Sequence, residues 1–241
     1  MNGPMERVPE PELMDDPQQA TAYAEADFRA TDAALVERIL AGFGRDPAGP
    51  ILDLGCGPGN ISFPLAQRCP ASRVVGLDGA ASMLAIAERR RREAPTELQR
   101  RLLFLKRILT PSGLATGGDP AATADSQLPP GSFRAVVSNS LLHHLHNPQA
   151  LWGAIRHLAA PGAAIHICDL RRPNDQKALE ALVAEHAAEA PPVLRRDYAN
   201  SLAAAFRPSE VEAQLRQADL GTLQVEALAD RYLEVRGRLP A

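Results

Sequence analysis

Aromatic residues and cysteine are both scarce in this chain of 241 residues. Phe, Tyr and Trp together make up 4% of the residues, so the core must consist largely of aliphatic side chains. The three cysteines, Cys56, Cys69 and Cys168, form neither a CxxC pair nor the spacing of a zinc site. Free thiols persist as small apolar residues in a reducing compartment, and we therefore expect a cytoplasmic protein.

Long apolar segments and a large net charge are also absent. No apolar run approaches the roughly 18 residues that a membrane helix needs. The first sixteen residues are acidic, contain proline and lack the apolar core of a secretory signal. A net charge of -3 creates no field that would gather nucleic acid or coat an anionic membrane. These absences argue against nucleic acid and membrane as partners, and they leave the oligomeric state open.

Short apolar strands alternate with helices through the first two thirds of the chain. We expect strands at residues 50–54, 73–77, 101–105, 133–138 and 163–168. We expect helices at residues 20–44, 60–68, 80–93 and 148–159, the first of them stopped by Gly44. Residues 110–131, rich in Pro, Gly, Ser and Asp, are interpreted as a surface loop, and Pro161-Gly162 as a turn.

The last third of the chain is predicted to be helical and then to end in a hairpin. The expected helices span residues 175–190, 198–206 and 208–218, and the expected strands span residues 223–229 and 232–236. The whole pattern predicts an α/β fold with a doubly wound sheet that ends in an antiparallel hairpin. We divide the chain into an N-terminal arm and helix (1–45), with residues 1–20 poorly packed, and a main domain (46–241) carrying a helical lid at about 173–207.

A glycine-rich turn follows the first strand, where open α/β folds bind ligands. Its glycines stand at positions 55, 57 and 59, and glycine tolerates positive φ and allows close approach of a ligand. Asn60 occupies the third glycine position of a dinucleotide fingerprint, and the turn has no lysine for a P-loop. Asp78 ends the second strand, where a carboxylate can accept from both ribose hydroxyls of a nucleoside. The plainer alternative is a βα turn in which Asp78 caps the next helix.

At this point the sequence resembles a known family. Asp-Leu-Gly-Cys-Gly-Pro-Gly-Asn at residues 53–60 resembles motif I of the class I S-adenosylmethionine (SAM)-dependent methyltransferases, and Gly-Leu-Asp-Gly-Ala-Ala-Ser-Met-Leu at residues 76–84 resembles their second motif. Residues 135–148 look like the fourth-strand motif of the small-molecule branch, and residues 159–162 like the turn before strand five. The resemblance implies a Rossmann-like seven-stranded sheet with strand order 3-2-1-4-5-7-6.

The resemblance also implies a cofactor, SAM, and a set of residues that bind it. Asp53 and the backbone of Gly55 and Gly57 should border the methionine part, and Cys56 and Asn60 are further candidates for cofactor binding. Asp78 should hold the ribose hydroxyls, with Gly79 and Met83 beside the adenine. Asn139 and Ser140 should face the sulfonium or the acceptor. The family often has an Asp after the third strand, whereas this chain has Lys106-Arg107-Ile108-Leu109, so Arg107 and Ile108 become candidates for the adenine contact.

Three histidines, His143, His144 and His146, follow the fourth strand. His143 or His144 can act as a general base or a substrate contact, and Asn139 is a further catalytic candidate. The alternative is structural, with a His ring that packs inward and bonds to backbone. We predict no metal site, because the sequence offers no fourth ligand or second cluster.

The acceptor is expected to lie beyond strand five, under the lid. Candidate substrate residues are Tyr23, Asp169, Arg171, Arg195 and Tyr198. An arginine here can clamp a carboxylate or phosphate, and surface charge is the alternative. Tyr23 can close over the cofactor or simply pack. The run Arg89–Arg92 is interpreted as a solvated helix end rather than a nucleic-acid patch.

Methyl transfer from SAM to a small molecule is the predicted function. Strand four ends in Ser-Asn-Ser-Leu at residues 138–141. It does not resemble Asn/Asp-Pro-Pro-Tyr/Phe, the signature of methyltransferases that act on planar amino groups. A non-catalytic SAM-binding protein, or one that modifies SAM itself, is an alternative. An NAD-linked oxidoreductase is a further alternative, although the glycine spacing argues against it.

Overall fold

The computed structural model describes residues 5–10, 13–44, 46–111, 113–115 and 128–241. The chain begins with two helices, α1 (Pro17–Glu25) and α2 (Arg29–Phe43), where one helix over residues 20–44 was expected. The single-helix prediction is wrong because Ala26 is extended and the Asp27 carboxylate accepts from the Arg29 N–H, a local bond that competes with helix continuation. Gly44 ends α2 with φ of 73°, as predicted.

Strands and helices then alternate along the chain as the apolar pattern indicates. The first half contains β1 (Ile51–Leu54), α3 (Ser62–Arg68), β2 (Val74–Asp78), α4 (Ala81–Glu93), α5 (Thr96–Arg101), β3 (Leu102–Lys106), β4 (Ile108–Thr110) and β5 (Gly113–Ala115). The second half contains β6 (Phe133–Asn139), the 3₁₀ turn η2 (Leu142–His144), α6 (Gln149–Leu158), β7 (Ala159–Leu170), α7 (Gln176–His186), α8 (Pro192–Ala204), α9 (Pro208–Gln217), β8 (Gln224–Leu228) and β9 (Tyr232–Arg238).

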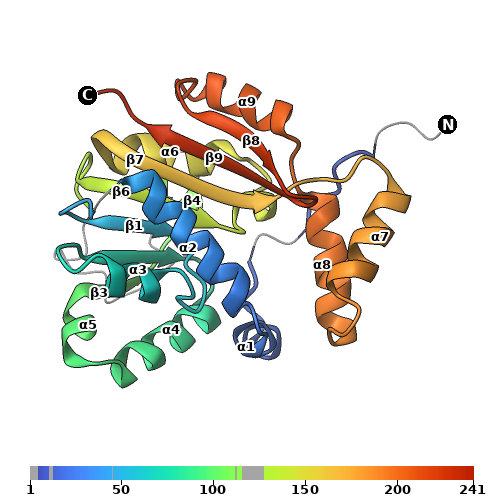
Figure 1. Ribbon diagram of the computed structural model, residues 1–241, viewed down its shortest axis with the longest axis horizontal. Coiled ribbons are helices and arrows are strands. Elements are labelled where there is room, and N and C mark those ends of the chain that lie inside the picture. Colours follow the sequence, from blue (N-terminus) through green and yellow to red (C-terminus); the bar gives the residue numbers. More distant parts are fainter. Residues whose placement is uncertain (1–4, 11–12, 45, 112, 116–127) are drawn as a thin grey trace.

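A seven-stranded sheet with the order β3-β2-β1-β6-β7-β9-β8 organises the molecule (Figure 1). The pairs from β3 to β7 are parallel, and β9 is antiparallel to both of its neighbours, β7 and β8. In strand-by-strand terms this is the predicted order 3-2-1-4-5-7-6, so the fold prediction is confirmed. The carboxyl ends of β1, β2, β6 and β7 therefore meet at one edge of the sheet.

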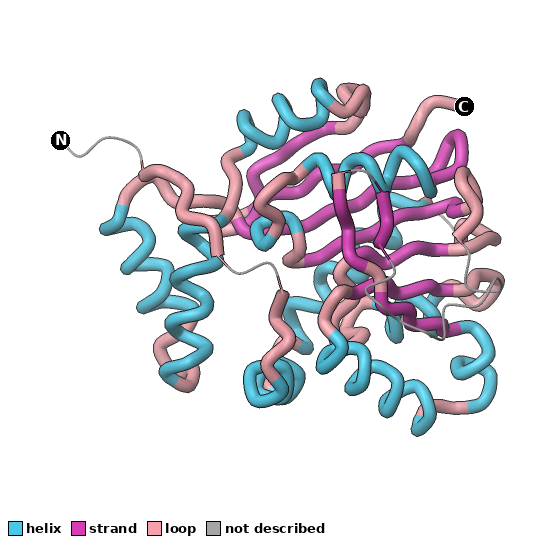
Figure 2. Tube along the Cα trace, turned by 180° about the vertical axis from the view of Figure 1, so that it is seen from behind, coloured by secondary structure: helices cyan, strands magenta, loops and turns pink. Residues whose placement is uncertain are grey.

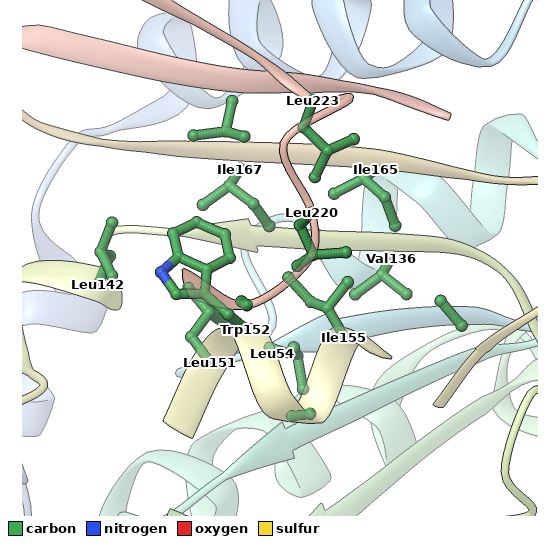
Figure 3. Close-up of a cluster of buried hydrophobic side chains, with 14 of the residues drawn as sticks. Leu54, Val136, Leu142, Leu151, Trp152, Ile155, Ile165, Ile167, Leu220 and Leu223 are labelled. Carbon is green, nitrogen blue, oxygen red and sulfur yellow. The ribbon is translucent and has the colours of Figure 1, made fainter. Parts of the chain in front are cut away.

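Helices cover both faces of the sheet. On one face, α6 and α9 pack against it through Trp152, Ile155 and Leu215, whereas α2 and α3 cover the other face through residues such as Ile39 and Leu65. Figure 3 shows α6 presenting Trp152 and Ile155 to the strand residues, and the Trp152 indole donates to Gln214 Oε1 at 3.0 Å. Apart from this indole and a few phenylalanines such as Phe133 and Phe206, the core is aliphatic, as the composition predicts.

Three local predictions fail. α5 was not expected, and an antiparallel pair, β4 with β5, occupies the start of the segment interpreted as a loop; residues 116–127 of that segment lie outside the described residues. The predicted turn at Pro161-Gly162 lies within β7, where Gly162 has φ of 72° and the pairing with β6 shifts register. A bulged strand absorbs the glycine there without ending.

The N-terminal arm packs against the sheet end that carries α7 and α8. Residues 1–20 were expected to be poorly packed, but the Met5 N–H donates to the Asn174 carbonyl at 2.8 Å and the Val8 N–H to the Ala203 carbonyl at 3.1 Å. Ala20 is fully buried. Figure 2 shows α7 and α8 as a pair that projects from the body of the sheet, with the N-terminal segment beside them. Among the described helices, none is long and apolar enough to cross a membrane.

Candidate functional site

The glycine-rich turn leaves β1 at the carboxyl edge of the sheet. Gly55, Gly57 and Gly59 have φ values of 70°, 52° and 88°, a left-handed region that costs side-chain-bearing residues free energy. A Cβ on Gly55 would lie 2.8 Å from the Leu141 side chain, and one on Gly59 would lie 2.8 Å from the Phe63 ring. Conformation thus favours glycine at all three positions, and packing requires it at Gly55 and Gly59, whereas Gly57 faces open space and leaves its backbone accessible to close approach.

Asp78 ties this turn to the end of β2. Its Oδ2 accepts from the Gly57 N–H and its Oδ1 from the Ala80 N–H, each at 2.8 Å. The N-cap of α4 is Ala80, and the first-turn N–H of Ser82 donates to Asp15 Oδ1 at 2.9 Å, so Asp78 is not the cap of this helix. Burial raises the pKa of Asp78, while the three backbone N–H groups of Ala80, Gly57 and Gly79 oppose that rise. A carboxylate has about four acceptor positions, so capacity remains for a vicinal diol.

Asp53 lies buried inside the same turn. The Ser62 hydroxyl donates to Asp53 Oδ2 at 2.6 Å. Burial, and to a smaller extent the neighbouring Asp78 charge, raises the pKa of Asp53 to about 7, although the bond from Ser62 acts in the opposite direction. An acidic group held this close to the glycine backbone suits a cationic ligand group, because a positive partner would offset the cost of its burial.

Gly79, Arg107 and Ile108 meet beside the end of β2. A Cβ on Gly79 would lie 3.5 Å from Ile108 Cγ1 and 2.6 Å from Leu13 of the arm, and the Arg107 N–H donates to the Asp78 carbonyl at 2.9 Å. Met83 is buried in a cluster with Ala20, and Tyr23 packs against that cluster. Gly79, Arg107 and Ile108 thus lie together, and Met83 belongs to a separate apolar cluster formed with the first helix.

Asn60 and Cys56 occupy the flanks of the turn. The Asn60 side-chain oxygen accepts from Arg90 Nη1 at 2.8 Å, which joins the turn to α4. Cys56 is buried, its N–H donates to the Leu77 carbonyl, and burial raises the pKa of its thiol well above the ordinary value. Cys56 is therefore a neutral packing group beside the turn.

The chain is strained at Ser140, directly after β6, at the same carboxyl edge of the sheet as the glycine turn. Ser140 has φ of 55°, and its N–H donates to the Cys168 carbonyl at 2.9 Å. A non-glycine residue in this conformation costs about 1–3 kcal/mol and persists where the surroundings impose it, often at functional sites. Asn139 pairs with Cys168 in the sheet just before this bend, and Leu141 just after it contacts Gly55. The bend brings the β6 end against the glycine turn.

His143 is held by the end of β7. Its Nδ1 lies 2.6 Å from Asp169 Oδ1, and Asp169 also accepts from the N–H groups of Leu142 and Leu170, both at 2.7 Å. Burial acts to lower the pKa of His143, but the charge and hydrogen bond of Asp169 and the charge of Glu10 outweigh it, so the pKa is raised. The structure thus joins two predicted site residues from different strands into one buried pair.

Glu10 is a site residue that the sequence interpretation missed. Its Oε1 lies 3.5 Å from His143 Nε2 and 3.2 Å from His144 Nδ1, and it accepts from the Ser201 hydroxyl of α8 at 3.0 Å. Burial raises the pKa of Glu10, against the effect of His143 and Ser201. Position 10 lies far from every recognised motif and is one of several acidic residues in the first sixteen positions, so no local signal distinguishes it.

Other predicted acceptor residues have different surroundings. Arg171 donates to the carbonyls of Ala229 and Asp230 at the β8–β9 turn, and Arg195 donates to the carbonyl of Ala187 at the end of α7. Tyr198 packs in a cluster formed with residues of α7 and α8. Tyr23 instead packs against the cluster that contains Met83, with its ring centre 5.0 Å from that of Phe28.

Comparison with known proteins gives consistent matches. A family model described as a methyltransferase domain matches residues 52–165. A curated relative, the ubiquinone biosynthesis O-methyltransferase of Xanthomonas campestris pv. campestris, is 28% identical over 193 residues, which is 80% of this chain and 71% of the relative.

Two solved structures have the same fold as this chain. The structure of a SAM-dependent methyltransferase from Aquifex aeolicus has a TM-score of 0.63 at 17% identity and covers 93% of this chain and 98% of its own. The structure of a Haemonchus contortus phosphoethanolamine N-methyltransferase, in complex with phosphomonomethylethanolamine and S-adenosylhomocysteine, has a TM-score of 0.65 at 14% identity and covers 93% of this chain and 58% of its own. At such identities the likeness is one of fold.

Proposed function

We propose that this chain, which belongs to the class I SAM-dependent methyltransferases and methylates a small molecule, transfers the methyl group to a hydroxyl oxygen of its acceptor. SAM supplies a methyl group made electrophilic by its sulfonium, so the protein has to bind, align and exclude water rather than create a reactive centre. The proposal therefore concerns which residues hold the two reactants and which group deals with the acceptor proton.

The residues at the carboxyl edge fit the donor. Asp78 retains acceptor capacity for two ribose hydroxyls, while its bond to the Gly57 N–H fixes the carboxylate against the turn. Asp53 offers a buried anionic neighbour for the ammonium group of the methionine part. Gly79 and Ile108 provide an apolar wall for the adenine, bordered by the backbone of Arg107, and Met83 adds an apolar side chain from a separate cluster. Asn139 and Ser140, at the bend of β6, then border the methyl group.

The choice of oxygen rests on one observation, the pairing of Glu10 with His144. His144 lies in η2, which follows Ser140 in the chain, and we call this pair the polar wall of the acceptor site. A neutral hydroxyl must lose a proton as the new carbon–oxygen bond forms, and a general base contributes typically about 10²–10⁴-fold to such a step. His143 has Asp169 at one ring nitrogen and Glu10 at the other. In the proposed reaction the carbon–sulfur bond breaks, the carbon–oxygen bond forms, and the acceptor proton passes to the His144–Glu10 pair.

The relatives support oxygen as the acceptor atom. The ubiquinone biosynthesis O-methyltransferases of Xanthomonas campestris and Burkholderia pseudomallei match 80% and 79% of this chain at 28% and 25% identity. Their names specify an O-methyl product. The N-methyltransferase structure shares the fold at 14% identity and carries less weight for the acceptor atom.

The arrangement of the arm and α8 supports a small, enclosed acceptor. We propose residues 173–207 as the helical cover of the main domain (46–241), with residues 1–45 as the arm and helix that complete it. Ser201 of α8 contacts Glu10, and η2 packs against α8.

The arginines at the end of α4 bind other parts of the chain. Arg90 donates to the carbonyls of Pro58 and Ala24, and Arg91 pairs with Glu88. That engagement favours a solvated structural role over nucleic-acid binding.

Incubation with SAM carrying a ¹³C-labelled methyl and a metabolite extract tests the proposal. The expected product carries its labelled carbon on oxygen, as the ¹³C chemical shift reveals. Replacement of Asp78 with Ala should weaken SAM binding by about 1–3 kcal/mol and reduce product accordingly. A label on nitrogen, sulfur or carbon contradicts the choice of oxygen, and the absence of any labelled product alongside tight SAM binding favours a non-catalytic SAM-binding protein.

A further inference from the structure

Three ligating side chains from the arm and η2 converge on one point beside the buried end of β7. Glu10 Oε1, a His143 ring nitrogen and His144 Nδ1 all lie within 4.8 Å of one another. His143 is 2% exposed, and Glu10 and His144 are half-buried. We propose that Glu10, His143 and His144 form a binding site for a divalent transition-metal cation of the zinc class.

The spacing of the three atoms suits a tetrahedral ion. Zinc–nitrogen and zinc–oxygen bonds of about 2.0–2.1 Å place neighbouring tetrahedral ligands about 3.3–3.4 Å apart. The separation between Glu10 Oε1 and His143 Nε2 is 3.5 Å, and that between Glu10 Oε1 and His144 Nδ1 is 3.2 Å. The two edges measured from Glu10 thus match a tetrahedron, and the His143 and His144 rings, whose centres lie 4.2 Å apart, would separate slightly on binding. Two imidazoles and one carboxylate also make a donor set of the borderline type that zinc prefers over calcium or magnesium.

The surroundings of His143 match those of a metal-binding histidine. Its far nitrogen, Nδ1, lies 2.6 Å from Asp169, and that carboxylate is itself fixed by two backbone N–H groups. Such a carboxylate sets the tautomer so that Nε2, which faces Glu10, presents a lone pair. Glu10 is also held in place by neighbouring groups. The Ser201 hydroxyl donates to its side chain, and His146 Nε2 lies 2.8 Å from its backbone carbonyl.

The local charge also favours a cation. Glu10 and Asp169 contribute two negative charges, and the nearest opposing group is Arg7, whose guanidinium is directed to the carbonyls of His143 and Leu145. By contrast, a second cluster of Glu185, His186 and Asp230 is exposed, and Arg231 Nη1 lies 2.7 Å from His186 Nδ1, where a guanidinium repels a metal ion. The first cluster is therefore the better site.

Three protein ligands leave one position of a tetrahedral ion open, the arrangement of zinc sites that take a water or substrate oxygen. Glu10 and His144 also form the wall proposed above for the acceptor, and as metal ligands they cannot take the acceptor proton at the same time. In a metal-bound form of the site the acceptor oxygen would instead occupy the open position of the ion. The binding itself depends only on the geometry of the three side chains and is independent of which atom the enzyme methylates.

Metal titration of the full chain, without any substrate, tests the inference. Chelator-treated protein should bind one Zn²⁺ per chain in competition with a chromogenic chelator, and Co²⁺ should give the intense visible bands of a tetrahedral site. Glu10→Gln and His144→Asn should each weaken Zn²⁺ binding by more than about 100-fold, and Asp169→Asn by about 10–100-fold. His186→Asn, in the second cluster, is the matched control and should bind Zn²⁺ like the wild type.

Circular dichroism of each variant establishes that it is folded, and the two ligand variants provide independent tests if one of them is not. Absence of saturable binding by the wild type overturns the inference. Wild-type affinity in folded His144→Asn overturns it as well, as does loss of binding in His186→Asn alone, which would place the ion at the exposed cluster. A failure of this kind leaves the labelling experiment on the acceptor atom unaffected.

Discussion

A buried carboxylate, Asp53, and a half-buried one, Asp78, flank one glycine turn, and both have raised pKa values. For each, burial is the largest cause, and the Asp78 charge adds to the shift at Asp53. A buried anion is tolerated when partners compensate for its lost hydration. The partners in the ligand-free chain are one hydroxyl for Asp53 and backbone N–H groups for Asp78. The turn is therefore arranged for binding at some cost to its own stability.

Replacement of Asp53 with Asn should reveal that cost through pH. The pKa of Asp53 rises from 3.8 to about 7 on folding, so between these values the folded chain binds more protons than the unfolded chain. The stability of the wild type then falls as pH increases through this window, and the fall is complete above it. Because Asn does not titrate, Asp53→Asn should gain stability relative to the wild type as pH rises.

Urea unfolding of both proteins at about pH 5 and about pH 8 measures this difference. The Asn side-chain oxygen can still accept from Ser62, which makes the substitution a fair match in shape. A stability difference that is equal at the two pH values, or larger at the lower one, contradicts the raised pKa.

Residues in the glycine turn and at the end of β2 could be identified from sequence because strand, turn and acidic residue follow one another at fixed spacing. Gly55, Gly57 and Asp78 indeed meet in the folded chain. Glu10 could not be found in this way. Its partners His143 and His144 are more than 130 positions away, and their contact depends on how the arm crosses the sheet end, which no local pattern encodes.

At the scale of elements, the N-terminal arm adds hydrogen bonds between η2 and the end of α8, two parts that already pack together. Arg7 Nη2 donates to the carbonyls of His143 and Leu145 at 2.9 Å, and Arg7 Nε donates to the Ala204 carbonyl. The guanidinium also lies 4.0 Å from the centre of the Phe206 ring. One side chain thus joins η2 to the end of α8, and the fork of the guanidinium is what allows it to reach these carbonyls together.

Replacement of Arg7 with Ala should loosen η2 and α8 together. Loss of hydrogen bonds from a charged donor costs about 1–3 kcal/mol, and we expect faster amide hydrogen exchange in residues 140–146 and 199–206. Arg7→Lys, which keeps the charge but lacks the planar fork, should show an intermediate effect. Unchanged exchange in η2 for Arg7→Ala would indicate that the arm rests on this surface without stabilising it.

Local chemistry explains where the prediction of elements succeeded and failed. Periodic apolar residues located the strands of the main sheet and the helices between them. The break between α1 and α2 depends on one side-chain bond at Asp27, and the β4–β5 pair depends on tertiary placement beside α6. Neither feature changes the apolar pattern, so a reading based on periodicity misses both.

At the scale of the whole molecule, the proposed donor site is assembled from segments distant in sequence. The arm supplies Leu13, α1 supplies Tyr23, and the β1, β2 and β6 ends supply the polar groups. Parallel strands make this possible, since their carboxyl ends lie at one edge regardless of the chain length between them. A ligand that touches all of these segments binds only the folded chain and should stabilise it as a unit.

Thermal unfolding with S-adenosylhomocysteine should therefore show a rise in the midpoint. At a concentration of about 100 times Kd the ligand stabilises the folded state by about 2.7 kcal/mol, which for a chain of this size corresponds to roughly 5–10 °C. NADH at the same concentration should produce no comparable rise, because Asn60 stands where a dinucleotide turn needs glycine. Asp78→Ala is the control within the chain and should reduce the shift given by S-adenosylhomocysteine. An equal rise with NADH, or none with S-adenosylhomocysteine, contradicts the assignment of the glycine turn to the methyl donor.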